Sequence, residues 1–175
     1  MKTLTILRHA KSSSAEANLD DHDRPLTEPG ENDALIMGDR IKAAGIRPSL
    51  IISSSALRAW QTARIVAKQL SYPIEFLYRE SDLYHAEINR LFDLIAAQDE
   101  GFNNIMVVGH NPGLTNLSNE LIPEVTSNIP TAGFISVLLE TDSWDLHNFH
   151  SCELIKYEHP KRHLSTQATI ATDDP

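Results

Sequence analysis

An arginine and a histidine stand side by side at the end of the first apolar run of the chain. Residues 3–7 are typical of a short buried strand, and Arg8 and His9 follow this run directly. The three serines at 12–14 then favour a loop. Because α/β proteins commonly build active sites where strands end in loops, we expect both side chains to face solvent from a rigid support. An imidazole in that place has the chemistry of a nucleophile.

Two later apolar runs end in a similar way. Residues 50–52 lead into a serine run and then Arg58, and residues 105–108 lead into Gly109 and His110. If the three runs are neighbouring parallel strands, their ends meet at one edge of a sheet. Two arginines and two histidines would then lie in one pocket.

This set of side chains suits a phosphoryl group. A planar guanidinium holds two oxygens at once, and two of them would offset the charge of a phosphate dianion and of its transition state. We expect Arg58 in the first turn of a helix, where free backbone amides and the helix dipole also favour an anion. The serine-rich loop after His9 would add hydroxyl and amide donors.

Helical spacing of apolar residues lies between the three runs. The pattern predicts helices over 27–44, 56–70 and 86–98, with Thr27 and Ser55 as N-caps of the first two. Strands that alternate with helices of this length indicate crossover connections. They favour a largely parallel sheet with helices on both faces.

Two further strands are expected late in the chain. They are predicted at 134–139 and 144–154, and the short polar link between them indicates an antiparallel pair at one edge of the sheet. The fold class is therefore α/β, mostly parallel with an antiparallel edge strand. We predict one domain over 1–160 and a disordered tail over 161–175, a segment with little to bury.

The composition excludes several classes of partner. The chain has 175 residues, of which 41% are hydrophobic and 22% charged, as in an ordinary soluble protein. Its net charge of −9 and its pI near 5.3 argue against binding of nucleic acid or of an anionic membrane. One cysteine, Cys152, and the lack of a long apolar segment predict a cytoplasmic protein.

Four sequence blocks resemble one enzyme family. They are Arg-His-Ala-Lys-Ser at 8–12, Arg-Pro-Leu-Thr at 24–27, Ser-Ser-Ala-Leu-Arg-Ala-Trp-Gln-Thr-Ala at 54–63 and Val-Gly-His-Asn-Pro at 108–112. In this order they resemble the histidine phosphatase (phosphoglycerate mutase-like) superfamily, and within it the short phosphohistidine phosphatases of the SixA type. The resemblance covers about residues 1 to 155. It implies a three-layer α/β/α fold and a covalent phosphohistidine intermediate without a metal or other cofactor.

The resemblance also implies roles for single residues. His9 falls on the nucleophile, Arg8 and Arg58 on the phosphate clamp, and His110 on the second histidine of the pocket. All four are therefore candidate catalytic residues. The candidate phosphate-binding residues are Arg8, Arg58, Ser12, Arg24 and His110.

The chemistry of imidazole agrees with these roles. An unperturbed imidazole titrates near pH 6.5, so a histidine can be neutral and nucleophilic near pH 7 if a hydrogen bond fixes its tautomer. A protonated His110 would add positive charge and a donor to the transferring oxygens. The histidines at 147 and 150 and Cys152 resemble zinc ligands in type, but we expect the two histidines on opposite faces of a strand, without a second ligand pair.

The proton donor for the leaving group is left open by the sequence. Mutases and sugar phosphatases of the superfamily use a carboxylate, whereas Glu80, Asp82 and Glu87 do not match the mutase pattern, and the segment 83–86 is more similar to the phosphohistidine phosphatase branch. Imidazole is a better leaving group than an alkoxide and demands less of an acid. We therefore expect a phosphohistidine protein as substrate. The alternatives are a small phosphate ester, with one of these carboxylates as acid, and a module that only binds phosphorylated partners.

Overall fold

A mixed six-stranded sheet forms the centre of the protein. The computed structural model describes residues 1–14 and 18–162, and in it the strands have the order β3-β2-β4-β1-β5-β6. The first four strands are mutually parallel, and β5 pairs antiparallel with both β1 and β6. The strands are β1 (Lys2–Arg8), β2 (Leu50–Ser54), β3 (Tyr78–Glu80), β4 (Asn104–Gly109), β5 (Phe134–Leu139) and β6 (Cys152–Glu158).

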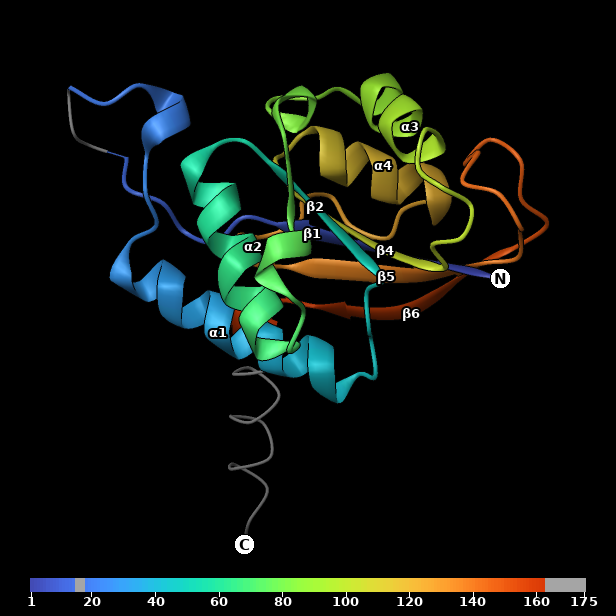
Figure 1. Ribbon diagram of the computed structural model, residues 1–175, viewed down its shortest axis with the longest axis horizontal. Coiled ribbons are helices and arrows are strands. Elements are labelled where there is room, and N and C mark those ends of the chain that lie inside the picture. The colour runs from blue at the N-terminus through green and yellow to red at the C-terminus, as the bar shows by residue number, and fades with distance from the viewer. Residues whose placement is uncertain (15–17, 163–175) are drawn as a thin grey trace, which may run out of the picture.

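Helices cover both faces of this sheet. The helices are α1 (Glu28–Ala43), α2 (Leu57–Gln69), α3 (Ile88–Ala96) and α4 (Gly113–Leu121), with short 3₁₀ helices η1 (Asp21–Asp23), η2 (Ile74–Phe76) and η3 (Ser81–Leu83). Figure 1 shows α3 and α4 together on one side of the sheet and α1 on the other, where α2 packs against it. The α/β class and the three layers predicted from the sequence are confirmed. Across the described ranges, no helix is both long and apolar enough to cross a membrane.

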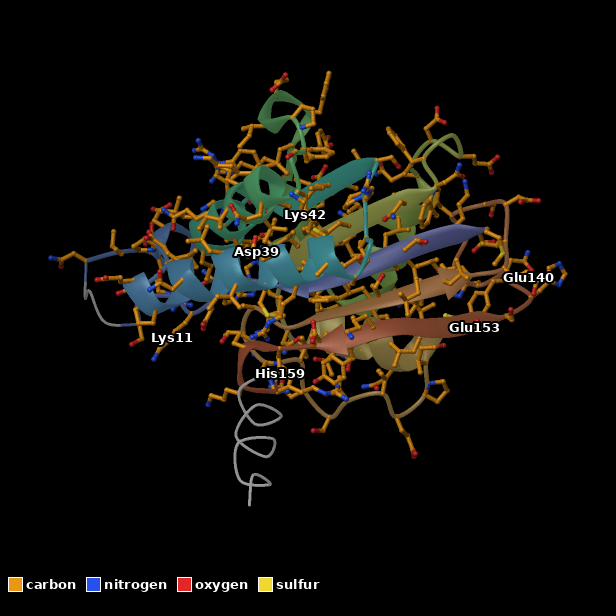
Figure 2. All side chains as sticks on the ribbon, turned by 90° about the horizontal axis from the view of Figure 1, so that it is seen from below. Lys11, Asp39, Lys42, Glu140, Glu153 and His159 are labelled. Carbon is orange, nitrogen blue, oxygen red and sulfur yellow. The ribbon has the colours of Figure 1, made fainter. Side chains whose placement is uncertain are left out.

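The register of the parallel strands brings the predicted site residues to one edge of the sheet. Arg8, the last residue of β1, lies opposite Gly109 of β4, and Ser53 of β2 lies opposite Val108. The backbone amide of His9 donates to the Gly109 carbonyl at 3.1 Å, which extends the ladder by one step. Figure 2 shows Lys11, two residues beyond His9, at the opposite end of the sheet from Glu140.

The N-cap predicted from the sequence is confirmed for α1 and wrong for α2. Thr27 is the N-cap of α1, and its hydroxyl oxygen accepts from the Gly30 amide at 3.1 Å, as predicted. Helix α2 is preceded by Ala56 without a side-chain cap, so the assignment of Ser55 as its N-cap is wrong. The hydroxyl of Ser55 instead forms a hydrogen bond with Nε2 of His22 at 2.8 Å.

The expected strand over 144–154 is wrong for most of its length. The last strand, β6, begins at Cys152, and Trp144 and Leu146 lie in the preceding loop. Both side chains are buried, whereas their neighbours Asp145 and His147 are exposed. The loop therefore shows the alternating burial that is typical of a strand, but it does not pair with another strand. Strand β3 and helix α4 were not predicted. Of the predicted tail at 161–175, residues 163–175 lie outside the described part of the chain.

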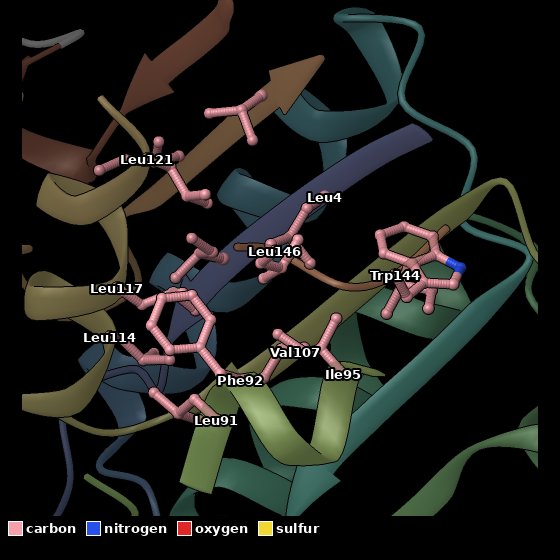
Figure 3. Close-up of a cluster of buried hydrophobic side chains, with 14 of the residues drawn as sticks. Leu4, Leu91, Phe92, Ile95, Val107, Leu114, Leu117, Leu121, Trp144 and Leu146 are labelled. Atoms are coloured by element: carbon pink, nitrogen blue, oxygen red, sulfur yellow. The ribbon is translucent and has the colours of Figure 1, made fainter. Parts of the chain in front are cut away.

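The larger core lies between the sheet and the α3–α4 layer. Apolar side chains of β1 and β4 meet those of both helices and of the loop before β6, as Figure 3 shows. Trp144 is 1% exposed, and its indole N–H donates to the Phe102 carbonyl at 2.8 Å. The labelled members of this core are Leu4, Leu91, Phe92, Ile95, Val107, Leu114, Leu117, Leu121, Trp144 and Leu146.

Truncation of this indole tests the packing. Trp144→Ala is expected to lower the free energy of unfolding by about 3–5 kcal/mol, because it leaves a large cavity in the core. Urea denaturation monitored by circular dichroism measures the change. The matched control is Phe76→Ala, which removes an aromatic ring that is 68% exposed and should change stability by about 0.5 kcal/mol or less. Equal losses in the two variants would contradict the assignment of Trp144 to the core.

Candidate active site

Four of the predicted site residues converge at the carboxyl ends of β1, β2 and β4. His9 follows β1 and His110 follows β4, and their ring centroids are 5.2 Å apart. Arg8 ends β1, and Arg58 occupies the first turn of α2. His9, His110 and Arg58 are buried, with exposed fractions of 8%, 6% and 2%.

A backbone contact sets the tautomer of His9. Its Nδ1 lies 2.8 Å from the carbonyl oxygen of Ala10, and because a carbonyl only accepts, Nδ1 carries the proton. The amide of Ala10 donates to Oγ1 of Thr62 at 3.0 Å, and this hydroxyl donates to the Arg58 carbonyl at 2.7 Å. The loop is thereby tied to α2, and Nε2 of His9 retains its lone pair.

His9 is also held in the neutral form. Burial lowers its pKa to about 4, and the positive charges of Arg58 and Arg8 act in the same direction, whereas the hydrogen bond to Ala10 opposes them. At pH 7 the ring is therefore unprotonated at Nε2. A neutral imidazole with a free nitrogen lone pair is the form that attacks an electrophile.

The hydroxyl of Ser54 gives His110 the same tautomer as His9. Its Nε2 lies 2.8 Å from Oγ of Ser54, which accepts from the Ala56 amide at 3.2 Å. Among the described residues this hydroxyl meets no other acceptor, so it donates its proton to Nε2 and the ring proton lies on Nδ1. Burial lowers the pKa of His110 to about 3, with smaller contributions from His9 and Arg58. The expected positive charge is absent in this state, but a neutral His110 still offers Nδ1–H as a donor.

Arg8 is oriented by a loop that the sequence did not single out. Its Nη1 donates to the carbonyl of Ile129 at 2.8 Å, and the side-chain amide of Asn111 donates to the same oxygen at 2.9 Å. The Nε atom of Arg8 is buried and has no hydrogen-bond partner among the described residues. The Nε–H of Arg8 is thus a buried donor without an acceptor in the described structure.

Arg58 is held by Asp21. Its Nη1 donates to the backbone carbonyl of Asp21 at 2.7 Å, and Nη2 donates to Oδ2 of the same residue at 3.0 Å. Nε of Arg58, like that of Arg8, is buried without a partner among the described residues. Both terminal nitrogens anchor the residue to η1, and the assignment of Arg58 to the phosphate clamp stays a prediction.

Asp21 joins several side chains at the edge of the pocket. Its carboxylate accepts from the hydroxyl of Tyr84 at 2.5 Å and from Nη2 of Arg24 at 2.9 Å, and Nε2 of His85 lies 3.2 Å away. The hydrogen bond from Tyr84, followed by those from Arg58, holds the pKa of Asp21 well below its usual value. Asp21 is therefore an anion that fixes the geometry of the surrounding donors.

Ser12 and Arg24 form an outer layer of this cluster. Nη1 of Arg24 donates to Oγ of Ser12 at 3.1 Å and to the carbonyl of Ser13 at 2.9 Å. Ser12 makes no hydrogen bond to Arg8 or Arg58 in the described structure. Arg24 approaches the pocket through Asp21, and its charge makes a small contribution to the lowered pKa of His9.

The three carboxylates considered as proton donors make contacts elsewhere. Glu80 accepts from the Asp82 amide at 3.0 Å, and Asp82 lies 3.6 Å from Nη2 of Arg90. Glu87 is exposed at the N-terminus of α3. In the described part of the chain, none of the three forms a hydrogen bond or ion pair with His9 or with the residues around it.

The possible zinc ligands near the end of the chain are not gathered into a site. Two of them, His147 and His150, lie in the loop before β6 and not on a strand, and the ring of His147 packs against Phe92 at 4.4 Å. Burial raises the pKa of Cys152 to about 11. Within the described ranges, no group of three or more His, Cys, Asp or Glu side chains is placed to hold a metal ion.

Comparison with known proteins agrees with this geometry. Residues 4–86 match the family model of the histidine phosphatase superfamily (branch 1). A crystal structure from Agrobacterium tumefaciens, of a protein assigned as the phosphohistidine phosphatase SixA, superposes with a TM-score of 0.78. The two sequences are 29% identical, and the alignment covers 91% of this chain and 98% of that one. The chain belongs to the histidine phosphatase superfamily.

The curated relatives of this chain are longer proteins. An uncharacterised chloroplast protein of Arabidopsis thaliana is 32% identical over 120 residues, which are 64% of this chain and 55% of that protein. A protein of Salmonella paratyphi A assigned as the phosphoglycerate mutase GpmB is 31% identical over 136 residues, 75% of this chain and 61% of that protein. The chain thus spans little more than half the length of these relatives.

Several residues of the site were not identified from the sequence as functional. Asp21 lies in an acidic run that resembles solvated surface, and Ser54 and Thr62 were noted only as parts of a block. Tyr84 and His85 were likewise noted only as part of a segment. The signal available for them was their position within or next to the four family-like blocks.

The two buried histidines predict a pH dependence of stability. Each has a folded-state pKa below the ordinary 6.5, at about 4 for His9 and about 3 for His110. Between these values and 6.5 the unfolded chain binds more protons, so stability is complete above pH 6.5 and falls as the pH decreases toward 4. Urea denaturation across this range gives the free energy of unfolding at each pH. In the double variant His9→Asn/His110→Asn this free energy should depend less steeply on pH than in the native protein. Identical slopes for variant and native protein would refute the burial effect.

Removal of the Ser54 hydroxyl tests the tautomer of His110. Ser54→Ala should lower kcat for phosphate ester hydrolysis by about tenfold, because His110 stays in place but its proton is no longer fixed on Nδ1. Loss of a whole hydrogen-bond donor typically costs more, about 10²–10³-fold. Nitrogen-15 NMR of the ring should show the proton leave Nδ1 in part. Ser54→Thr, which keeps the hydroxyl, should restore both the kcat and the nitrogen-15 spectrum of the native protein. The neighbouring control is Ser53→Ala, whose hydroxyl donates to the Ser54 carbonyl, and an equal loss there would contradict the argument.

Proposed function

We propose that the protein is a metal-independent phosphatase that acts through a phosphohistidine intermediate at His9, and that its substrate is phosphohistidine on a protein. The observation that carries this proposal is the set of unpartnered polar atoms around a neutral His9. Nε of Arg8, Nε of Arg58 and Nδ1 of His110 are buried without a hydrogen-bond partner among the described residues. Buried donors of this kind are normally satisfied, and three of them suit the oxygens of a phosphoryl group.

The proposed reaction has two steps. Nε2 of His9 attacks phosphorus, the bond to the leaving group breaks, and the phosphoryl group becomes attached to His9. Water then attacks phosphorus, and the bond to Nε2 breaks. Arg8 and Arg58 supply the positive charge that a metal ion supplies in other phosphatases, and Nδ1–H of His110 donates to an oxygen of the transferring group.

The pocket edge supports a substrate presented by a protein surface. The described residues at this edge include Asp21 and His85, whose side chains are 46% and 58% exposed. An open edge of this kind admits a phosphorylated side chain together with the surface that bears it. The assigned SixA protein that is similar over nearly its whole length supports the same substrate class, and the single cysteine suits the cytoplasm.

A small phosphate ester is the second candidate substrate. The sequence similarity to a protein assigned as GpmB favours it. The contacts of Glu80 and Asp82 argue against it, because the carboxylate required by an alkoxide leaving group is engaged outside the pocket. A module that only binds phosphorylated partners would have no need of a neutral histidine with a free lone pair.

The first test concerns the nucleophile. His9→Asn should abolish turnover and prevent the protein from taking up an acid-labile, alkali-stable radiolabel from a ³²P-labelled substrate, because the covalent step requires Nε2. The labelling assay uses a small protein phosphorylated on histidine and, in parallel, a panel of sugar phosphates. Hydrolysis by His9→Asn at the native rate would end the proposal. Higher kcat/KM on sugar phosphates would favour the second candidate.

Amide substitutions test the carboxylates. Glu80→Gln, Asp82→Asn and Glu87→Gln should each reduce the rate on phosphohistidine by less than about tenfold, whereas a general acid contributes about 10²–10⁴-fold. Steady-state rates on phosphohistidine and on alkyl phosphates measure this. A hundredfold loss at one position, restricted to alkyl phosphates, would identify that carboxylate as the acid.

A further inference from the structure

The proposed reaction leaves open which group gives a proton to the leaving atom. His9 and His110 are neutral, and Asp21 is held as an anion, so none of these three carries a proton that it could donate as an acid. Tyr84 does not serve, because burial and its hydrogen bond to Asp21 raise the pKa of its phenol. A further group at the pocket edge is needed.

We propose that His85 is this proton donor. Its ring lies 5.6 Å from that of His110, and its side chain is 58% exposed. The ring of His110 in turn lies 5.2 Å from that of His9, so two buried histidines are followed by an exposed one at the surface. In an in-line transfer the leaving group departs on the side away from the buried nucleophile, and we place the exposed His85 on that side.

Asp21 equips His85 for this role. The Nε2 atom of His85 lies 3.2 Å from Oδ2 of Asp21, so Nε2 carries a proton that it donates to the carboxylate. The carboxylate lies against the Nε2 edge of the ring, and Nδ1 of His85 makes no hydrogen bond to any described residue. The other charged or titratable groups near this ring are Tyr84 and His110. Beyond Asp21 lie Arg58 and Arg24.

The backbone holds His85 in one place. Its φ of +52° is a left-handed conformation that non-glycine residues adopt at a cost, and such residues cluster at functional sites. The ring packs against that of Tyr84 at a tilt of 39°, with centroids 4.1 Å apart. A Cβ at Gly113 would overlap the carbonyl of Ala86, so the glycine lets α4 close against this segment. The imidazole is therefore positioned by the packed fold.

The proton balance of the step, which rests on the proposed function, is complete. As Nε2 of His9 bonds to phosphorus and the bond to the leaving atom breaks, the proton on Nδ1 of His85 passes to that atom. In the second step the neutral His85 takes a proton from the attacking water, whose oxygen bonds to phosphorus as His9 departs. His85 returns to the imidazolium form.

The test compares two aryl phosphates with leaving groups of different basicity. His85→Gln should lower kcat for phenyl phosphate by about 10²-fold and for p-nitrophenyl phosphate by less than about threefold, because nitrophenolate departs without a proton. Added imidazole should restore part of the phenyl phosphate activity of His85→Ala. The matched control is His22→Gln, which removes another imidazole at this edge, one that contacts Ser55 and the ring of Tyr84, and it should leave both rates unchanged.

The outcomes separate this inference from the proposed function. Equal losses on both substrates, or no loss on either, would overturn the role of His85 even if phosphorylated His9 accumulates. Failure of the native protein to form phosphorylated His9 would instead overturn the proposed function.

Discussion

The in-register parallel pairing of β1, β4 and β2 is the constraint on which the site depends. It aligns Arg8 with Gly109 and Ser53 with Val108, so the loops that follow begin at the same height of the sheet. Both faces of the sheet are buried: Leu4 faces the α3–α4 core, whereas Leu7 faces the α1–α2 core. A slip by one residue would exchange the two sets of side chains, and this would move His9 away from His110.

Burial of positive charge gives the pocket its chemistry. Arg58 is almost fully buried, and a buried cation is unfavourable unless it is paired. The carboxylate of Asp21 pairs with it and makes this burial possible. The two guanidinium groups and the low polarity of the surroundings keep His9 unprotonated. In the proposed reaction, the features that attract the phosphoryl group therefore also prepare the nucleophile that attacks it.

Residues that lie at strand ends could be recognised from the sequence, and those brought in by loops could not. Arg8, His9 and His110 follow apolar runs, and a parallel sheet places such residues together whatever the details of the loops. Asp21 reaches Arg58 across 37 positions and Tyr84 across 63, through chain segments that have no regular pattern. A polar residue in such a segment looks like ordinary solvated surface until the fold is known.

The sequence by itself determined the α/β class, the three strand ends and the residue types of the pocket, because apolar periodicity and turn residues act over short stretches of chain. Only the tertiary structure decided which nitrogen of each histidine carries the proton, which residue anchors the terminal nitrogens of Arg58 and where the last strand begins. These properties depend on burial and on partners distant in the chain. Ala10 selects the tautomer of His9 locally, whereas Ser54 selects that of His110 from 56 positions away.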